Sequence, residues 1–364
     1  MKIFIVRYKK TAKVFEGGEQ GSEKNLAVLQ QIVGKDNVYT YFVHDESVQR
    51  KKIDYLKGLF FSLGGYYFGL TPRRVRKIVL MAQGYDVVFI DRSLFGIVAK
   101  QLKHSNYKGR VICFFHNVEA VYFSAKYSSL WNPLRWITVK LADYNDKLSC
   151  HYADKIIALS KRDDNELQGR YGRRADVLIP VAFVDRYKKE SYPHDRIREK
   201  PLCMFLGAYF PANVEGIEWF VKNVYPKVNI QMQIVGKGMD KIRSAAWMRN
   251  DIGVISDAPD LEPYFEAADI MVLPIFKGSG MKVKTCESLM YGKNIIATDE
   301  ALVGYDVDET KMGARCNTAE EFISAINDLC EHPRPRYNDY SRQTFLQKYS
   351  MSAVIEKFRR AISI

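Results

Sequence analysis

Long hydrophobic runs and paired cysteines are absent from this chain. No apolar stretch approaches the roughly 18–20 residues that a membrane-spanning helix needs. The six cysteines are scattered without a C-x-x-C pair, so the sequence indicates neither a zinc site nor a disulfide framework. The opening MKIFIVRYKK has no following cleavage site, and it predicts a buried strand instead of a secretory signal. These absences favour a protein of the reducing cytoplasm.

Internal repeats and low-complexity segments are also absent, which excludes solenoids and disordered linkers as the main architecture. The 364 residues exceed one typical core and fit two domains of roughly 150–200 residues each. The polar stretch 185–201 lacks apolar periodicity and marks the join. We therefore expect an N-terminal domain over 1–187, a C-terminal domain over 188–345, and a last helix within 346–364 that belongs to the second domain or returns to the first.

Short β-rich runs alternate with helix-compatible segments in both halves of the chain. Near-continuous apolar strands of this kind predict parallel sheets covered by helices on both faces. Two such series predict an α/β protein of two doubly wound, Rossmann-like domains. The expected strands are 2–8, 38–43, 86–91, 110–116, 155–160 and 176–181 in the first half, and 202–208, 230–236, 251–255, 269–275 and 294–298 in the second.

The net charge of +13 lies almost entirely in the first half of the chain. Such an excess indicates an anionic partner there, either a membrane surface or nucleic acid, or simply a solubilising basic surface. No base-stacking motif or recognition helix accompanies the charge, so we expect no nucleic acid partner.

The segment PIFKGSGMKVKTCESLMYGKNIIAT, residues 274–298, carries the strongest chemical pattern. Gly278, Ser279 and Gly280 follow a predicted buried strand at its carboxyl end, where open α/β sheets bind ligands. A turn of this composition can aim backbone N–H groups at an anion, and the helix that starts near Met281 adds its positive dipole end.

Two lysines and one carboxylate complete this pattern. Lys282 and Lys284 can supply the full charges that a diphosphate needs, and Glu287 lies on an otherwise apolar helix face. A carboxylate there is costly to bury unless it accepts hydrogen bonds, which paired ribose hydroxyls would donate. Gly292 is expected to end the helix. A plain strand-turn-helix-strand unit with a surface glutamate is the alternative.

The chain runs from a strand through the Gly-Ser-Gly turn, the basic pair, the glutamate and the glycine to the next strand. This order resembles that of the retaining GT-B glycosyltransferases of the family 4 type. The stretches FLGAYFPANVEGIEWF, IVGKG, APDLEPYFEAADIMVLPI and DKIIALSKRDDNEL follow the family's order as well. The resemblance covers essentially the whole chain, and it is more specific in the second half.

The resemblance implies two domains with an interdomain cleft and transfer of a sugar from a nucleoside diphosphate sugar to an acceptor hydroxyl, without a metal or other cofactor. A UDP-sugar is the favoured donor, with GDP- and TDP-sugars as alternatives. The basic first half of the chain suggests a lipid-linked or membrane-proximal glycan as the acceptor, as in bacterial surface polysaccharide assembly. The catalytic residues implied are His116, Lys282, Lys284 and Glu287. The donor-binding residues implied are Gly17, Gly18, Gly207, Pro259, Leu261, Gly278, Ser279, Gly280 and Met281. The acceptor or cleft residues implied are Arg92, Asn117 and Glu119, and we give Asp91 beside them less weight.

The chain also departs from the family pattern. Many members carry two glutamates eight positions apart, and Ser279 stands where the first would lie. No basic residue occurs in GAYFPANVEG, where the family often has an Arg and a Lys, so Lys282 and Lys284 are the expected substitutes. Ser256 replaces a glycine that is usual near the base-binding turn. These departures affect the identity of the donor.

Basic and aromatic residues gather between residues 48 and 77. Ile53, Leu56, Phe60, Leu63 and Tyr67 recur at spacings of three and four beside several lysines and arginines. This pattern is typical of an amphipathic helix lying on an anionic bilayer, at the inner face of the cell membrane. A pair of helices packed in the core is the alternative. The tryptophans of YSSLWNPLRW, Trp131 and Trp136, fit a membrane interface.

Two rival functions are weighed against the transferase. A nucleotide-sugar epimerase of the same architecture would need no acceptor and would have little use for a basic, aromatic first domain. A non-catalytic protein that binds anionic ligands or nucleic acid would bind without turning over a nucleotide sugar.

Overall fold

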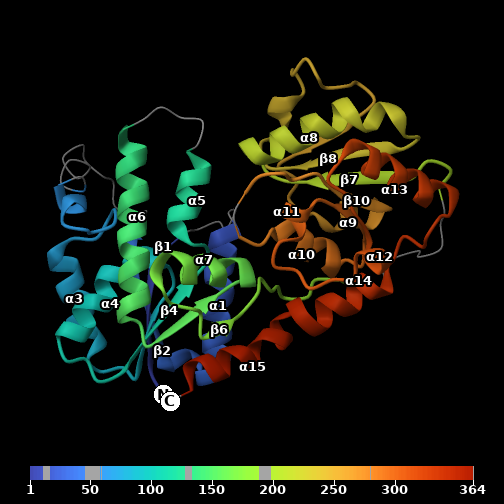
Figure 1. Ribbon diagram of the computed structural model, residues 1–364. Coiled ribbons are helices and arrows are strands. Elements are labelled where there is room, and N and C mark those ends of the chain that lie inside the picture. The colour runs from blue at the N-terminus through green and yellow to red at the C-terminus, as the bar shows by residue number, and fades with distance from the viewer. Residues whose placement is uncertain are drawn as a thin grey trace. The chain divides into compact units, whose positions relative to one another are not determined.

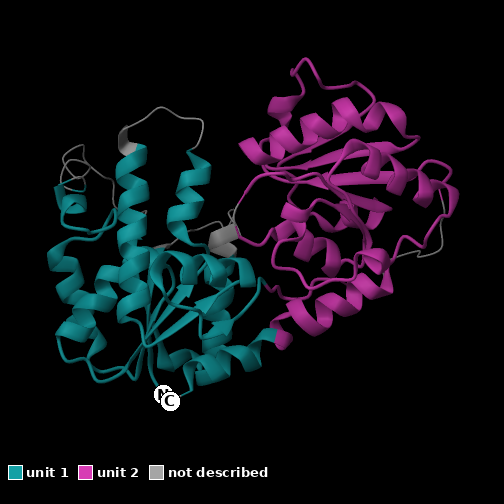
Figure 2. Ribbon diagram, viewed as in Figure 1, with its two compact units in different colours: residues 1–181, 354–364 teal, residues 182–353 magenta. Residues whose placement is uncertain are grey.

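The computed structural model describes residues 1–10, 17–45, 58, 60–127, 133–187, 198–278 and 280–363. The chain divides into two compact units, Met1–Val181 together with Val354–Ile364, and Ala182–Ala353 (Figure 2). The domain boundaries expected after residues 187 and 345 stay a prediction.

The first unit is built on a parallel sheet with strand order β2-β1-β3-β4-β5-β6 (Figure 1). The strand order reverses between β1 and β3, and such a switch point is where doubly wound sheets hold ligands. The strands are β1 Ile3–Lys10, β2 Val38–Asp45, β3 Val87–Ile90, β4 Arg110–Phe115, β5 Lys155–Ala158 and β6 Val177–Leu178. The helices are α1 Gly17–Val33, α3 Pro72–Ala82, α4 Gly96–His104, α5 Glu119–Lys126, α6 Pro133–Tyr152 and α7 Lys161–Tyr171.

The second unit repeats the design with strand order β12-β11-β10-β7-β8-β9. Its switch point lies between β7 and β10. The strands are β7 Leu202–Leu206, β8 Gln231–Gly236, β9 Gly253–Ser256, β10 Ile270–Leu273, β11 Asn294–Ala297 and β12 Gly313–Arg315. The helices are α8 Pro211–Asn223, α9 Glu262–Ala267, α10 Val283–Met290, α11 Asp299–Leu302, α12 Glu309–Met312, α13 Ala319–Glu331, α14 Asp339–Thr344 and α15 Met351–Ile362, which continues into the first unit.

Burial and capping explain why these segments fold as they do. Every residue of β3 and β7 is buried, as the apolar runs require of strands that are covered on both faces. Helices begin where a hydroxyl can cap them: Ser160 accepts a hydrogen bond from the N–H of Asp163, and Thr318 with Glu321 forms a capping box. The predicted α/β class with two doubly wound sheets is confirmed.

The last helix completes the core of the first unit. The ring of Phe358 in α15 stacks on that of Phe114, with centroids 6.1 Å apart, and lies 6.4 Å from that of Phe89. Lys155 donates a hydrogen bond of 3.0 Å to the carbonyl of Arg360. Residues 354–362 therefore cover strands that belong to the first half of the chain.

Helix α8 approaches the carboxyl end of β10 very closely. A Cβ atom built on Gly216 would lie 1.9 Å from the carbonyl oxygen of Pro274, so only glycine lets the two backbones meet. This contact fixes the start of the segment that leads into α10, which ends with Gly292 in the left-handed region at φ +57°, as predicted.

The amphipathic helix predicted for residues 48–77 can be compared with the structure only where the structure describes these residues. Ile53 and Leu56 lie outside the described residues. Phe60 and Leu63 are 70% and 81% exposed. The prediction that Tyr67 shares their face is wrong, because the chain turns at Gly64 and Gly65 and Tyr67 packs in the core with 5% exposure. In the part of the chain that the structure describes, no helix is both long and apolar enough to cross a membrane.

Glycine-to-alanine exchanges in two helices test the packing of α8. Gly216→Ala forces α8 off the Pro274 carbonyl and should lower the free energy of unfolding by about 1–3 kcal/mol. Gly169→Ala in α7 meets no atom within 4 Å and should raise it by about 0.5–1 kcal/mol through helix propensity. Urea unfolding of both variants measures the difference. Equal effects of the two exchanges would contradict the close approach.

Candidate functional site

A partly buried lysine stands at the switch point of the second sheet. Lys284, the second residue of α10, donates a 2.6 Å hydrogen bond to Oδ1 of Asn213 in α8, and its Nζ lies 4.6 Å above the centre of the Phe205 ring. A Cβ atom on Gly207, directly after β7, would come within 3.0 Å of this Nζ. In the described part of the chain no carboxylate forms an ion pair with Lys284. Its charge is therefore available to an anion.

The pKa of Lys284 reflects this setting. Burial and the nearby charge of Lys282 lower the pKa of Lys284 to about 7, and Glu287 opposes the shift. A bound anion would favour the protonated form and raise the pKa again. The lysine can therefore take up a proton when a phosphate binds.

Lys282 is placed differently from Lys284. It caps α10, and its Nζ donates to Oε1 of Glu300 at 2.6 Å and to the carbonyl of Gly280 at 2.8 Å. Its charge is thus matched by a carboxylate in this structure. The sequence analysis assigned both lysines to the diphosphate, whereas in the structure Lys282 pairs with Glu300 and Lys284 bonds to Asn213.

Glu287 lies one turn after Lys284 on the partly buried side of α10. Its carboxylate has no hydrogen-bond partner among the described residues. Burial raises the pKa of Glu287 to about 7, against the opposing charges of Arg186 and Lys284. A partly buried carboxylate with unused acceptor capacity can hold a ligand that offers hydroxyl donors.

The glycine turn before α10 adopts conformations that side chains disfavour. Gly278 has φ +155° and Gly280 has φ +65°. Ser279 lies outside the described residues. Met281 is buried, and α10 begins two residues later, at Val283. The turn thus brings a helix amino end to the same sheet edge as Lys284.

The turn between β9 and α9 lies at the same edge of the sheet. Pro259 is exposed and Leu261 is the residue before α9. Helix α9 packs on α10 through Phe265 and Tyr291, whose rings stack 4.3 Å apart. Ser256, which replaces the usual glycine, hydrogen-bonds to Asp240 and Asp257.

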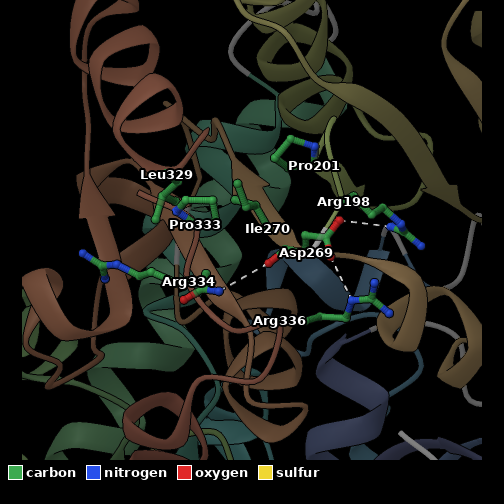
Figure 3. A pocket seen from close by; sticks show the side chains of 9 residues that line it. Arg198, Pro201, Asp269, Ile270, Leu329, Pro333, Arg334 and Arg336 are labelled. Atoms are coloured by element: carbon green, nitrogen blue, oxygen red, sulfur yellow. Dashed lines mark hydrogen bonds and ion pairs between the residues drawn. The ribbon is translucent and has the colours of Figure 1, made fainter. Parts of the chain in front are cut away.

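A pocket at the opposite edge of this sheet is part of the scaffold. Asp269, just before β10, accepts hydrogen bonds from Arg198 at 3.0 Å and from Arg336 at 2.8 Å (Figure 3). It also accepts one from the N–H of Leu202. The pocket lies at the amino ends of β7, β10 and β11 and is lined by Arg198, Pro201, Asp269, Ile270, Asn294, Leu329, Pro333, Arg334 and Arg336. Its ion pairs fix strand starts and lie away from Lys284.

The switch point of the first sheet holds a buried polar network. Asp91, directly after β3, is 1% exposed and accepts hydrogen bonds from Asn25 at 2.8 Å and from Nε2 of His116 at 3.1 Å. Nε of Arg7 lies 3.7 Å from its second oxygen. Burial raises the pKa of Asp91, but His116 and Arg7 outweigh this and hold it below the usual value.

His116 is enclosed at this point with 6% exposure. Burial lowers the pKa of His116 despite the attraction of Asp91, so its imidazole is neutral at neutral pH and its Nε2–H donates to Asp91. A Cβ atom on Gly21 would come within 3.0 Å of the ring. His116 thus contacts α1 and Asp91 at once.

The other first-half candidates are spread around this network. Gly17 and Gly18 form the first turn of α1, where the sequence placed them before the helix. The guanidinium of Arg92 lies 5.9 Å from the centre of the Tyr8 ring. Asn117 is partly buried. Glu119 opens α5 fully buried, and burial raises its pKa.

Sequence reasoning missed several partners of the candidate residues. Asn213 and Glu300 hold the two lysines, and Arg7 and Asn25 hold Asp91. In the sequence, the arginine within the apolar run of β1 was the one feature that could have indicated a buried carboxylate partner. Among the described residues, no three histidines, cysteines, aspartates or glutamates gather to hold a metal ion.

Family models match both halves of the chain. Residues 200–332 match "Glycosyl transferases group 1", and residues 38–180 match "Glycosyltransferase Family 4". No curated protein sequence matches the chain.

Solved structures share the fold over the full chain. HepE of Anabaena in complex with UDP has a TM-score of 0.70 at 13% identity, with 100% of both chains covered. Sucrose-phosphate synthase of Thermosynechococcus elongatus has a TM-score of 0.71 at 14% identity, with 99% and 98% covered. The lipopolysaccharide outer core galactosyltransferase WaaB has a TM-score of 0.68 at 16% identity, with 100% and 99% covered. The predicted GT-B architecture is confirmed.

NMR of lysine Cε tests the protonation of Lys284, with Lys293 as the internal control. Burial lowers the pKa of both to about 7, and Lys293 donates to the carbonyl of Ala268 in the interior. Two resonances should titrate near pH 7, and Lys284→Gln should remove one of them. Pyrophosphate should raise the pKa of Lys284 and leave that of Lys293 unchanged. A parallel response of both lysines would contradict an anion site at Lys284.

Proposed function

The chain belongs to the GT-B glycosyltransferases of the family 4 type, and on this basis we propose that it transfers a sugar with retention at the anomeric carbon. The donor is a nucleoside diphosphate sugar, and the acceptor is a hydroxyl group. One observation carries the proposal: Lys284, Asn213 and the amino end of α10 converge at the carboxyl edge of β7 and β10.

The diphosphate of the donor binds at the start of α10. Backbone N–H groups after Gly280 and the ammonium of Lys284 face its oxygens, and Lys282 contributes when it exchanges Glu300 for the ligand. In the reaction the bond between the anomeric carbon and the phosphate oxygen breaks, and the acceptor oxygen bonds to that carbon on the same face. The hydroxyl proton leaves with the diphosphate. Charge stabilisation of this leaving group is the main catalytic contribution.

The nucleoside lies beside α9 and α10. Glu287 accepts hydrogen bonds from the ribose hydroxyls, and the base lies near Pro259 and Leu261. HepE, which shares the fold, has been crystallised with UDP and with UDP-glucose. This favours a UDP-sugar over GDP- and TDP-sugars as the donor.

The lysines and the helix amino end supply the positive charge that a divalent cation supplies in other transferases. We therefore propose that transfer proceeds without a metal. Activity that persists in a strong chelator supports this, and activity restored only by added Mg²⁺ or Mn²⁺ opposes it.

The first unit is proposed to bind the acceptor. His116, Arg92, Asn117 and Glu119 follow β3 and β4 at the edge where α1 begins with Gly17 and Gly18, which are proposed to face the donor diphosphate. These side chains offer hydrogen-bond donors and acceptors to sugar hydroxyls.

A lipid-linked glycan at an anionic membrane surface is the proposed acceptor, as in bacterial surface polysaccharide assembly. Trp136, Lys140 and Tyr144 recur every fourth residue on the exposed side of α6, and Trp136 is 66% exposed. The ring of Tyr144 contacts the turn at Gly65, which carries Phe60 and Leu63 just before it. Aromatic and aliphatic side chains beside lysines suit the interface of an anionic bilayer. We call Phe60, Leu63, Trp136, Lys140 and Tyr144 the α6 patch.

A double-mutant cycle on nucleotide binding tests the role of Glu287. Glu287→Gln keeps the shape but removes the charge that the ribose hydroxyls contact, so UDP affinity should fall by about tenfold to a hundredfold. 2′,3′-Dideoxy-UDP should bind the wild type as weakly as UDP binds the variant. Calorimetry measures all four affinities.

The same cycle can contradict the assignment. If Glu287→Gln weakens UDP and its dideoxy analogue by the same factor, Glu287 does not contact the ribose. If no UDP, GDP or TDP species binds the wild type, the donor proposal itself is wrong.

Vesicle sedimentation tests the α6 patch. Vesicles that contain phosphatidylglycerol should bind the wild type, and those of phosphatidylcholine alone should not. Phe60→Ser combined with Trp136→Ser should abolish the binding, because the apolar anchors are lost. Leu80→Ser, at an exposed leucine on α3, is the matched control and should bind like the wild type. Equal loss in both variants, or no binding by the wild type, would overturn the membrane proposal.

A further inference from the structure

Asp91 is the centre of the buried network in the first unit. Its Oδ1 accepts from Asn25 of α1 at 2.8 Å and from His116 after β4 at 3.1 Å, while Arg7 of β1 faces Oδ2. Three separate segments thus meet on one carboxylate with 1% exposure. No other described carboxylate in this unit has a hydrogen bond to both a helix and a neighbouring strand end at the switch point.

Consecutive residues of α1 are tied to the same place. Gly21 lies against the His116 ring, and Oγ of Ser22 is 3.5 Å from Nε2 of His116. Glu23 accepts a 2.7 Å hydrogen bond from Arg7, and Lys24 donates to the carbonyl of Pro180 at 3.4 Å. With Asn25, every residue from 21 to 25 contacts a strand or a residue that follows one. These contacts anchor the second turn of α1, and they thereby hold the first turn, which begins at Gly17, in one position.

Charge adds to the hydrogen bonds of this network, because Oδ2 of Asp91 and Nε of Arg7 form no hydrogen bond and interact as an ion pair at 3.7 Å. Asp91 is ionised, Arg7 offsets its charge, and the neutral His116 donates through Nε2–H. The charges of Arg92 and Lys24 also face His116 and disfavour its protonation. An ionised acceptor fixes the tautomer and the ring plane of the histidine, since the other nitrogen then lacks the proton.

We propose that Asp91 is a positioning residue of the transfer reaction, which holds the first turn of α1 and the His116 ring in the geometry that transfer requires. The proposal rests on the function proposed above, since the amino end of α1 lies at a ligand-binding switch point. Asp91 itself is enclosed by protein groups and acts through Asn25 and His116. Its loss should therefore reduce the rate of transfer more than the binding of the nucleotide, which the second unit provides.

Asp91→Asn separates these effects. The amide keeps the shape and one acceptor oxygen but removes the charge that orients both donors. We expect kcat to fall by about a hundredfold, since displacements near 1 Å have such effects, while the affinity for UDP stays unchanged. Glu166→Gln is the matched control: it removes an exposed ion pair with Arg170 within α7, leaves α1 and the contacts of Asp91 intact, and should change kcat by about twofold or less.

Two measurements need no substrate, and they test whether Asp91 positions α1 and His116 independently of any transferase activity. In the wild type, ¹⁵N NMR should show the Nε2–H tautomer of His116, and amide hydrogens of α1 should exchange slowly. In Asp91→Asn a mixture of tautomers and faster exchange at residues 17–25 are expected. If the protein transfers no sugar but these two changes occur, the function proposed above fails and the anchoring role stands.

Two further variants cover the case in which Asp91→Asn does not fold. Asn25→Ala removes only the link from α1 and should speed exchange there with an unchanged His116 tautomer. Gly21→Ala adds helix propensity but places a methyl group 3.0 Å from the His116 ring, so it should lower kcat in a folded protein. Wild-type kcat in a folded Asp91→Asn, or in both further variants, would overturn the proposal. Unchanged exchange of α1 in a folded Asp91→Asn would overturn it as well.

Discussion

A parallel strand that is covered by helices on both faces is apolar along most of its length and carries most of its polar groups near its ends, and this constraint governs where chemistry occurs in the protein. All residues of β3 and β7 are buried. The polar side chains that matter follow these strands: Asp91 stands directly after β3 and Gly207 directly after β7. Because strand order reverses at both places, the helices on either side diverge and leave room for them. Both sheets thus concentrate their reactive groups at one edge.

The two switch points satisfy their charges in opposite ways. In the first unit the carboxylate of Asp91 is matched in charge by Arg7, and its Oδ1 accepts hydrogen bonds from Asn25 and His116. In the second unit the partners of Lys284 among the described residues are the neutral oxygen of Asn213 and the face of Phe205. A buried charge that is matched within the protein favours rigidity, and an unmatched one favours a ligand. This difference supports the proposal that the donor diphosphate binds at the second edge.

The sequence predicted the strands well because apolar runs of four or more residues report burial directly. It missed β12, whose three residues, Gly313–Arg315, are only partly buried and carry no such run. It also placed Tyr67 on a lipid-facing stripe, since spacing alone does not show that the chain turns at Gly65. The turn residues were visible, but the periodicity dominated the interpretation.

Side-chain partners were harder to predict than elements, and distance along the chain is the reason. Arg7 and Asp91 are far apart in sequence and meet only because β1 pairs with β3. Lys282 and Lys284 look equivalent in the sequence, yet Glu300 from α11 reaches only the first of them. A local pattern can nominate a charged residue, but only the fold decides which partner neutralises it.

The packing of Phe358 on Phe114 has a consequence for the order in which the protein matures during synthesis. Residues 354–362 follow the whole second unit along the chain, yet they cover the sheet of the first. Domains usually fold as they leave the ribosome, amino-terminal part first. Here the earlier unit must wait with part of its apolar surface open until the later one has been translated. The nascent chain thus passes through a stage in which its second half is ready to fold before its first half is finished.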